Sequence, residues 1–272
     1  NFSVFSYGTS NNSINSDGTM VYAKAAVLYD VNTNKLLYEK NAYEKLFPAS
    51  TTKTMTAILA MEHCKLTDIV KASYYSIHEI PRTYSTGLLV PNEELTVEQL
   101  LNLLMIPSAN DAAYILAQYI ANGCSNQYDM SSSDAAKKKF DQDVQTFSNM
   151  MNSKAAELGC TNTHFLNPNG VHNENHYSTA YDLCLIGSYA LKFPELNNIT
   201  KKALQVIHYG NINGKDTEFF SRDNTIQTAS LKLTDKQIYL RNLSEKEARS
   251  LIRSELGFSN NDFIFVFIGR LV

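Results

Sequence analysis

Residues 47–57 have the sequence Phe-Pro-Ala-Ser-Thr-Thr-Lys-Thr-Met-Thr-Ala, and apolar residues begin to recur at helical spacing after the proline. This pattern predicts a helix from about Ser50 to His63, since a proline suits the start of a helix. Residues three apart share one helix face, so Lys53 is expected to lie one turn above Ser50. The two side chains are thereby predicted to be neighbours.

A serine beside a lysine is a pattern of nucleophilic catalysis. A serine hydroxyl is a weak nucleophile and needs an adjacent base. A lysine supplies that base where burial or a neighbouring positive charge lowers its pKa. The first helical turn also offers N–H groups and a dipole that favour developing negative charge. Ser50 and Lys53 are therefore candidate catalytic residues, although S-x-x-K alone is also the sequence of many ordinary solvated helix starts.

A second polar group, Ser108-Ala-Asn110, follows Pro107 about 55 residues downstream of the first. It lies between a helix that begins at a capping box, Thr96-x-x-Gln99, and a helix predicted over residues 110–120. Such a corner can direct two short polar side chains into a cleft. The serine could pass a proton to a leaving amine, and the amide could hold a substrate peptide group. The alternative is a helix N-cap with an Asx turn.

Composition sets the broad class. The 272 residues include 44% hydrophobic and 19% charged residues with a net charge of −3, a balance typical of a folded protein and not of a disordered one. No basic run is present, so we expect no nucleic-acid partner. The longest apolar stretch, residues 263–268, is far shorter than the roughly 20 residues that span a bilayer.

The cysteine and histidine patterns give little support for a metal site or for redox chemistry. The four cysteines, Cys64, Cys124, Cys160 and Cys184, form no C-x-x-C pair, so buried thiols are expected, with one disulfide left open if the chain is exported. The histidines of His172-Asn-Glu-Asn-His176 have a spacing that zinc sites use. They follow a Pro-Asn-Gly turn instead of lying on a helix, so we expect no metal and no cofactor.

The remaining segments predict a mixed fold. Residues 1–19, rich in Ser and Asn, are expected to be disordered. Two strands, 21–31 and 35–39, around an Asn-Thr-Asn turn predict a hairpin. Two more helices are expected over residues 140–158 and 179–191.

Beyond Phe193 the pattern changes. A strand is predicted at 204–208, a turn at 210–214, and a helix capped by Ser244-x-x-Glu247. The apolar run 263–268 is typical of a strand buried on both faces of a parallel sheet. One such strand and one helix do not complete a doubly wound sheet, so the sheet is expected to be incomplete.

The two polar groups occur in the order of a known signature, S-x-x-K and then S-x-N, found in penicillin-binding proteins and class A β-lactamases. Three flanking stretches extend the match: Gly87-Leu-Leu-Val-Pro-Asn-Glu-Glu-Leu, Pro107-Ser-Ala-Asn-Asp-Ala-Ala and Asn167-Pro-Asn-Gly-Val-His. Over about residues 20–199 the sequence resembles the serine-type D-alanyl-D-alanine carboxypeptidases, which are low-molecular-mass penicillin-binding proteins. The resemblance implies an α/β, penicillin-recognising serine acyltransferase (β-lactamase-like) fold, a helical lobe against an antiparallel sheet.

The resemblance also implies a mechanism. Ser50 would attack the carbonyl between the two terminal D-alanines of a peptidoglycan stem peptide and become acylated. Lys53 would take the serine proton, Ser108 would pass a proton to the departing D-alanine, and Asn110 would help hold the substrate. β-Lactam antibiotics would acylate Ser50, and neither metal nor cofactor would take part. The family works outside the cytoplasmic membrane, so an extracytoplasmic location in a bacterium is implied, although no signal peptide is present in this sequence.

A β-lactamase is the nearest alternative. In that class a glutamate in E-x-x-L-N activates the deacylating water. The stretch Phe193-Pro-Glu-Leu-Asn197 has phenylalanine at the glutamate position and lies much too far after Ser108, so we reject this interpretation.

The sequence departs from the family pattern after Asn110, where no K-T-G, H-T-G or K-S-G occurs. In the family that motif lies on a strand lining the cleft and recognises the substrate carboxylate. Neither Gly214-Lys-Asp-Thr217 nor Ser85-Thr-Gly87 satisfies it, so the substrate-binding residues stay unassigned. Residues 200–272 instead resemble a segment of a retaining two-domain glycosyltransferase, or form a divergent sheet segment. The alternative function is a catalytically inactive penicillin-binding-protein fragment fused to a glycosyltransferase fragment.

Overall fold

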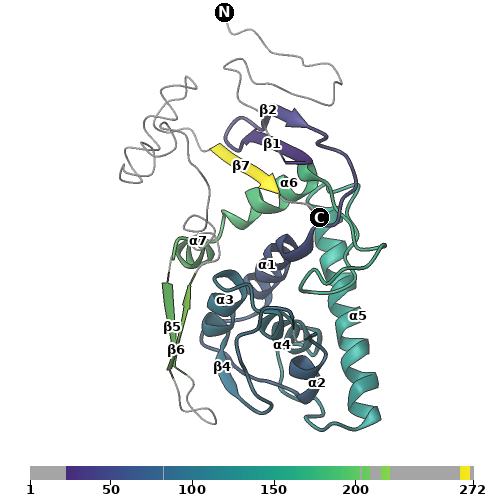
Figure 1. The fold of residues 1–272 in the computed structure, drawn as a ribbon, viewed down its shortest axis with the longest axis vertical. Coiled ribbons are helices and arrows are strands. Elements are labelled where there is room, and N and C mark those ends of the chain that lie inside the picture. Colours follow the sequence, from purple (N-terminus) through teal and green to yellow (C-terminus); the bar gives the residue numbers. More distant parts are fainter. Residues whose placement is uncertain (1–22, 82, 203, 209–215, 221–263, 270–272) are drawn as a thin grey trace, which may run out of the picture.

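The structure, a computed structural model, describes residues 23–81, 83–202, 204–208, 216–220 and 264–269. A small sheet packs on one helix, α6 (Ala180–Ala190), and a larger group of helices lies on the other side of α1 (Lys53–His63) (Figure 1). Helix α1 contacts both parts and is central to the fold.

The sheet has the strand order β2-β1-β7, all antiparallel, among the described residues. Strands β1 (Ala25–Asp30) and β2 (Lys35–Lys40) form the predicted hairpin, and α6 packs against β1. The Asp30 carboxylate accepts hydrogen bonds from the Asn32 and Thr33 N–H groups and so stabilises the turn.

The apolar run predicted to be a strand of a parallel sheet is strand β7 (Ile264–Gly269), and the parallel arrangement is wrong. Strand β7 pairs antiparallel with β1 along the edge opposite β2, with Ala25 facing Gly269 and Asp30 facing Ile264. A continuous apolar run reports burial on both faces, and burial does not determine strand direction. Helix α6 also contacts β7, so one face of the strand is covered.

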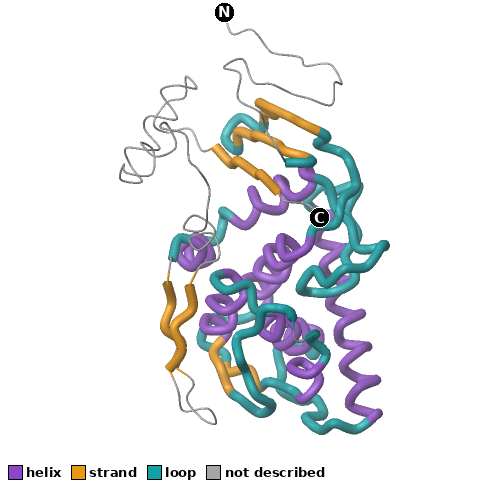
Figure 2. The backbone as a smooth tube through the Cα atoms, in the orientation of Figure 1, coloured by secondary structure: helices purple, strands orange, loops and turns teal. Residues whose placement is uncertain are grey.

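The helical part supplies most of the core. Helices α3 (Val97–Met105) and α4 (Asn110–Ala121) pack on α1, and the long helix α5 (Asp134–Glu157) packs against α4 (Figure 2). Fully buried leucines of α3 fill the space between these helices: Leu100, Leu101, Leu103 and Leu104. None of the helices in the described part of the chain combines the length and apolar character that membrane crossing requires.

Several helix boundaries follow the sequence signals. The predicted capping box is formed, with the Gln99 N–H donating to Thr96 Oγ1 and the Thr96 N–H to Gln99 Oε1, at 3.1 and 2.8 Å. Helices α4 and α6 match their predictions within a residue. Helix α5 begins at Asp134 and not Phe140, since Ser133 caps it through the Ala136 N–H.

The helix predicted to begin at Ser50 starts differently. A 3₁₀ turn, η1 (Ala49–Thr52), precedes α1, which begins at Lys53. A 3₁₀ turn has three residues per turn, so it aligns residues three apart more closely than an α-helix does. The correction therefore strengthens the predicted proximity of Ser50 and Lys53.

The other elements are short. Strands β3 (Ile69–Lys71) and β4 (Glu94–Thr96) pair antiparallel, and helices α2 (Tyr74–His78) and α7 (Pro194–Thr200) were not predicted. The predicted strand at 204–208 is β5 (Leu204–His208), which pairs with β6 (Asp216–Phe220). Residues 1–19, the predicted turn at 210–214 and the helix predicted after Ser244 lie outside the described residues.

Candidate active site

Lys53 is the centre of the candidate site. Its side chain is 2% exposed, whereas Ser50 is exposed at the surface of the 3₁₀ turn. The Lys53 Nζ lies 3.2 Å from Ser50 Oγ, 3.0 Å from Asn110 Oδ1 and 2.9 Å from the Asn169 carbonyl oxygen. One amine thus joins the 3₁₀ turn, the start of α4 and the loop at residues 167–170.

Asn110 is held rigidly where α4 begins. Its backbone N–H and its Nδ2 both donate to the Ser85 carbonyl oxygen, at 2.9 and 2.8 Å, which leaves Oδ1 directed at Lys53. The neighbouring Asp111 accepts from the Gly87 N–H at 2.8 Å, and burial raises the pKa of this carboxyl group. The segment from Ser85 to Gly87 is thereby fixed against α4.

The same segment contains Ser85-Thr-Gly87, the sequence that was rejected above as a match to the family's K-T-G motif. Tyr84, next to it, lines the cleft described below, so the segment lies at the site. It forms a loop and not a strand, and the Asp111 carboxylate accepts from its Gly87 N–H. The segment therefore does not replace a cleft-lining K-T-G strand.

Ser108 differs from the other three candidates. Its backbone has a φ of 62°, the left-handed region that residues with a side chain rarely adopt. Its hydroxyl is buried and has no hydrogen-bond partner among the described residues. The structure thus brings Ser50, Lys53 and Asn110 together in one network, whereas the hydroxyl of Ser108, two residues before Asn110, makes no hydrogen bond to it.

The loop at residues 167–170 is a part of the site that the sequence indicated only as a turn. Asn167 Oδ1 accepts from the Gly170 and Val171 N–H groups, and the Pro168 carbonyl oxygen accepts from Thr56 Oγ1 at 2.6 Å. These bonds present the Asn169 carbonyl to Lys53. No local sequence signal could show that this carbonyl would reach α1.

Gly170 allows the loop to approach the 3₁₀ turn. Its φ is 82°, and a Cβ at this position would lie 1.8 Å from the Ala49 carbonyl oxygen. Real Cβ atoms never come so near to a backbone atom, so only glycine fits here. The Asn-Pro-Asn-Gly pattern was the signal available, since glycine marks a backbone that must turn or approach closely.

His176 connects the same loop region to the helix. It is 2% exposed; its Nδ1 accepts from the Leu166 N–H at 3.1 Å, and its Nε2 therefore donates to Thr52 Oγ1 at 2.9 Å. Both ring nitrogens are thus used in hydrogen bonds. His172 instead packs its ring edge-on against Phe47 at 4.5 Å.

Burial lowers the pKa of His176 to about 4, and this predicts a pH-dependent stability. An unfolded histidine titrates near 6.5, so between pH 6.5 and 4 the unfolded chain binds more protons than the folded one. We expect the free energy of unfolding to fall by about 3 kcal/mol as the pH falls through this window, with no further loss from this group below it. Thermal melts across pH 4–7.5 measure the slope.

His176→Gln supplies the control for that measurement. Glutamine does not titrate and can still donate a hydrogen bond to Thr52, so its melting temperature should depend less on pH between 6.5 and 4 than that of the unchanged chain. Equal slopes would show that His176 does not enter the folded state as the neutral ring.

The side chains surround a cleft of about 240 Å³. Its lining includes Ser50, Tyr84, Asn110, Asn169, Gly170 and His172. An exposed serine whose hydroxyl faces a buried amine in a cleft is an arrangement for nucleophilic attack on a bound carbonyl.

The sequence matches a known protein family. The sequence pattern of the D-alanyl-D-alanine carboxypeptidase family matches residues 11–235. The chain is 38% identical over 183 residues to D-alanyl-D-alanine carboxypeptidase DacF of Bacillus subtilis, which covers 65% of this chain and 41% of that protein. It is 34% identical over 192 residues to a D-alanyl-D-alanine carboxypeptidase of Streptomyces sp. K15, covering 68% of this chain and 61% of that protein.

The fold has a solved counterpart as well. The crystal structure of the Streptomyces K15 DD-transpeptidase superposes with a TM-score of 0.64 at 29% identity, covering 77% of each chain. The chain spans about two fifths of the length of the Bacillus relative and about three fifths of the Streptomyces relative.

Proposed function

This chain belongs to the D-alanyl-D-alanine carboxypeptidase family, and from that premise we propose that it is a serine peptidase that acts through an acyl-enzyme on Ser50. The fold is the penicillin-recognising fold that the sequence predicted. The observation that carries the proposal is the position of Lys53 Nζ, 3.2 Å from Ser50 Oγ inside a buried network. The proposed substrate is a peptidoglycan stem peptide that ends in D-Ala-D-Ala, outside the cytoplasmic membrane.

The contacts of Lys53 support its role as the base. A neutral amine has two N–H donors and one lone pair. In the proposed role the N–H groups donate to the Asn110 Oδ1 and the Asn169 carbonyl, and the lone pair accepts the proton of Ser50 3.2 Å away. In the proposed step Ser50 Oγ bonds to the substrate carbonyl carbon, and the N–H groups of the first helical turn stabilise the oxyanion.

The next step needs a proton on the leaving group. The carbon–nitrogen bond to the terminal D-alanine breaks as its amine accepts a proton, and we assign Ser108 to this transfer: its hydroxyl donates to the amine and regains the proton that Lys53 took from Ser50. A buried hydroxyl without a partner is rare in native proteins, and strained backbone of this kind persists where function requires it. The substrate supplies the missing hydrogen-bond partner. Water then hydrolyses the acyl-enzyme and regenerates Ser50.

Ser108→Ala tests that assignment by separating stability from activity. The hydroxyl makes no hydrogen bond that could be lost, so the melting temperature should stay the same or rise by a few degrees. The release of D-alanine should slow by about 10²- to 10⁴-fold, the range of one proton-transfer group. An unchanged rate, or a large loss of stability, would contradict the role given to Ser108.

Recognition of the substrate carboxylate has no assigned residue. The family's K-T-G motif is absent after Asn110, and the loss of one oxyanion donor slows such enzymes by about 10²- to 10³-fold. We propose that Ser50, Lys53, Ser108 and Asn110 carry the chemistry, without metal or cofactor.

The test of the proposed function is intact-mass spectrometry after incubation with benzylpenicillin. A single adduct of penicillin mass, located on Ser50 by peptide mapping, is the expected result. Hydrolysed penicillin, which has no reactive ring, is the matched control and should give no adduct. A second assay follows D-alanine released from a D-Ala-D-Ala peptide. A folded chain that gives neither adduct nor D-alanine would overturn the proposal in favour of an inactive fragment.

The resemblance of residues 200–272 to a glycosyltransferase segment is a separate prediction. The family match extends to residue 235, so it includes the first part of that segment. We propose that residues 20–199 carry the peptidase motifs. The glycosyltransferase alternative predicts binding of a sugar nucleotide and no reaction with penicillin, so calorimetry with a uridine diphosphate sugar separates the two.

A further inference from the structure

Two of the four cysteines lie in contact. The Sγ atoms of Cys64 and Cys124 are 3.2 Å apart, although 60 positions separate these residues in the sequence. Cys160 and Cys184 are buried elsewhere, beside helix α6 and within it. A disulfide has a sulfur–sulfur distance of about 2.05 Å, so Cys64 and Cys124 need to approach by only about 1 Å to become bonded.

Each thiol is positioned by the end of a helix. Cys64 caps α1, with its N–H bonded to the Ala60 carbonyl at 3.0 Å. Cys124 follows α4 directly after Gly123, whose φ of 67° turns the chain, and the Cys124 N–H donates to the Tyr119 carbonyl at 3.0 Å. Cys64 is the C-cap residue of α1 with extended backbone, and Cys124 has a left-handed φ of 56° three residues past the last residue of α4, so both thiols lie close to a helix end.

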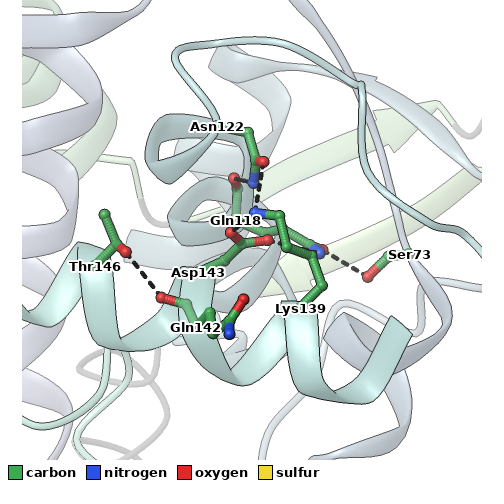
Figure 3. A network of polar contacts seen from close by, with 7 residues as sticks. All are labelled: Ser73, Gln118, Asn122, Lys139, Gln142, Asp143 and Thr146. Carbon is green, nitrogen blue, oxygen red and sulfur yellow. Dashed lines mark hydrogen bonds and ion pairs between the residues drawn. The ribbon is translucent and has the colours of Figure 1, made fainter. Parts of the chain in front are cut away.

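The end of α4 is held in place by a polar network with α5 (Figure 3). Lys139 Nζ donates to Asn122 Oδ1 at 2.9 Å and forms an ion pair with Asp143, and Asn122 Nδ2 donates to the Gln118 carbonyl at 2.8 Å. Asn122 is only two residues before Cys124. The hydrogen bonds of Asn122 with Lys139 and Gln118 therefore restrict the positions that the Cys124 thiol can adopt.

The end of α1 is held by a second set of contacts. Glu62 Oε1 pairs with Lys154 Nζ at 2.9 Å and accepts from the Tyr189 hydroxyl at 2.6 Å. Glu62 is two residues before Cys64. The reduced chain therefore already holds both thiols close to their bonded positions, and little conformational freedom remains to be lost on bond formation.

We propose that Cys64 and Cys124 form a disulfide that ties the C-terminal end of α1 to that of α4 in an oxidising compartment. With a small-molecule disulfide as oxidant, the reagent's S–S bond breaks and the new S–S bond forms. Both thiol protons end on the two thiols released from the reagent. The reaction needs no residue of the candidate active site.

The bond would stabilise the pair of helices that carries the site. Lys53 begins α1 and Asn110 begins α4, and their side chains are hydrogen bonded at those opposite ends. Lys53 and Cys64 lie about 16 Å apart along the helix, given a rise of 1.5 Å per residue. The disulfide therefore acts on the alignment of α1 and α4 and does not enter the chemistry at Ser50.

The experiment compares the reduced full chain with the chain treated with oxidised glutathione. Burial raises the pKa of the Cys64 thiol, so the treatment is carried out at alkaline pH, where more thiolate is present. Intact mass should fall by two hydrogen atoms, and peptide mapping should yield one linked pair, Cys64 with Cys124. The melting temperature should rise by about 5–10 °C, and the rise should disappear on reduction.

Cys64→Ser and Cys160→Ser form the matched pair of variants. The melting temperature of Cys64→Ser should be the same under reducing and oxidising conditions, whereas that of Cys160→Ser should rise on oxidation as much as in the unchanged chain. Stable glutathione adducts, a different linked pair, or a linked chain with an unchanged melting temperature would each overturn the proposal. The mass, the linked peptides and the melting temperature do not depend on acylation, so failure of this proposal can be told apart from failure of the proposed peptidase function.

Discussion

A Ser50→Ala variant is expected to form no adduct with benzylpenicillin and to release D-alanine about 10⁶ times more slowly than the unchanged chain. Lys53→Met is expected to come close to the same residual rate. The reason is geometric: the Nζ of Lys53 lies 3.2 Å from the Ser50 hydroxyl oxygen, within reach of its proton. Rates of adduct formation and of D-alanine release measure both variants.

The two variants should differ in stability, which separates misfolding from lost chemistry. Ser50 is exposed, so its replacement should leave the melting temperature nearly unchanged. Lys53 is buried, and methionine keeps the volume but leaves the Asn110 Oδ1 and the Asn169 carbonyl without its N–H donors. Each unsatisfied buried acceptor costs about 1–3 kcal/mol, so a lower but cooperative melt is expected.

The double variant gives the sharper test. Groups that act as one unit are far from additive, so Ser50→Ala with Lys53→Met should be no slower than Ser50→Ala alone. A Lys53→Met chain that still acylates within tenfold of the unchanged chain would refute lysine as the base. If the rate of the double variant is reduced by the product of the two single reductions, the two residues act independently.

The local parts of the site followed from the sequence. The proximity of Ser50 and Lys53 depends on a three-residue spacing, and the corner before Asn110 depends on a proline and a capping box. Both are short-range patterns that neighbouring residues determine. Even the correction from an α-helix to a 3₁₀ turn left the predicted contact intact.

The parts that sequence reasoning missed are long-range contacts. The Asn169 carbonyl meets Lys53 across 116 positions, and His176 meets Thr52 across 124. No periodicity or motif spacing encodes which backbone carbonyl will reach a distant amine. The direction of β7 was wrong for the same reason, because pairing with β1 is a property of the folded chain. Ser108 was assigned correctly to the corner, but its buried, unpaired hydroxyl could be found only in the structure.

Gly170→Ala is expected to disrupt both the fold and the site. The new methyl group would lie 1.8 Å from the Ala49 carbonyl oxygen, a backbone atom that cannot rotate away. The left-handed φ of 82° adds about 1–2 kcal/mol for any residue with a Cβ, and overpacking of this kind adds about 1–3 kcal/mol. We expect a total loss of about 2–5 kcal/mol and a melting temperature lower by about 5–20 °C.

Gly159→Ala is the matched control, because it isolates the clash from the backbone strain. Gly159 has nearly the same φ, 83°, at the end of α5, but a Cβ there would meet no atom within 4 Å. This variant should lose only the 1–2 kcal/mol of the left-handed conformation and should acylate at the normal rate. Gly170→Ala should in addition acylate far more slowly, because the turn that it displaces carries Ser50 and its own loop carries the carbonyl that holds Lys53. If the two variants melt and acylate alike, then the loop at 167–170 does not touch the 3₁₀ turn, and the Asn169 carbonyl cannot be what orients the base.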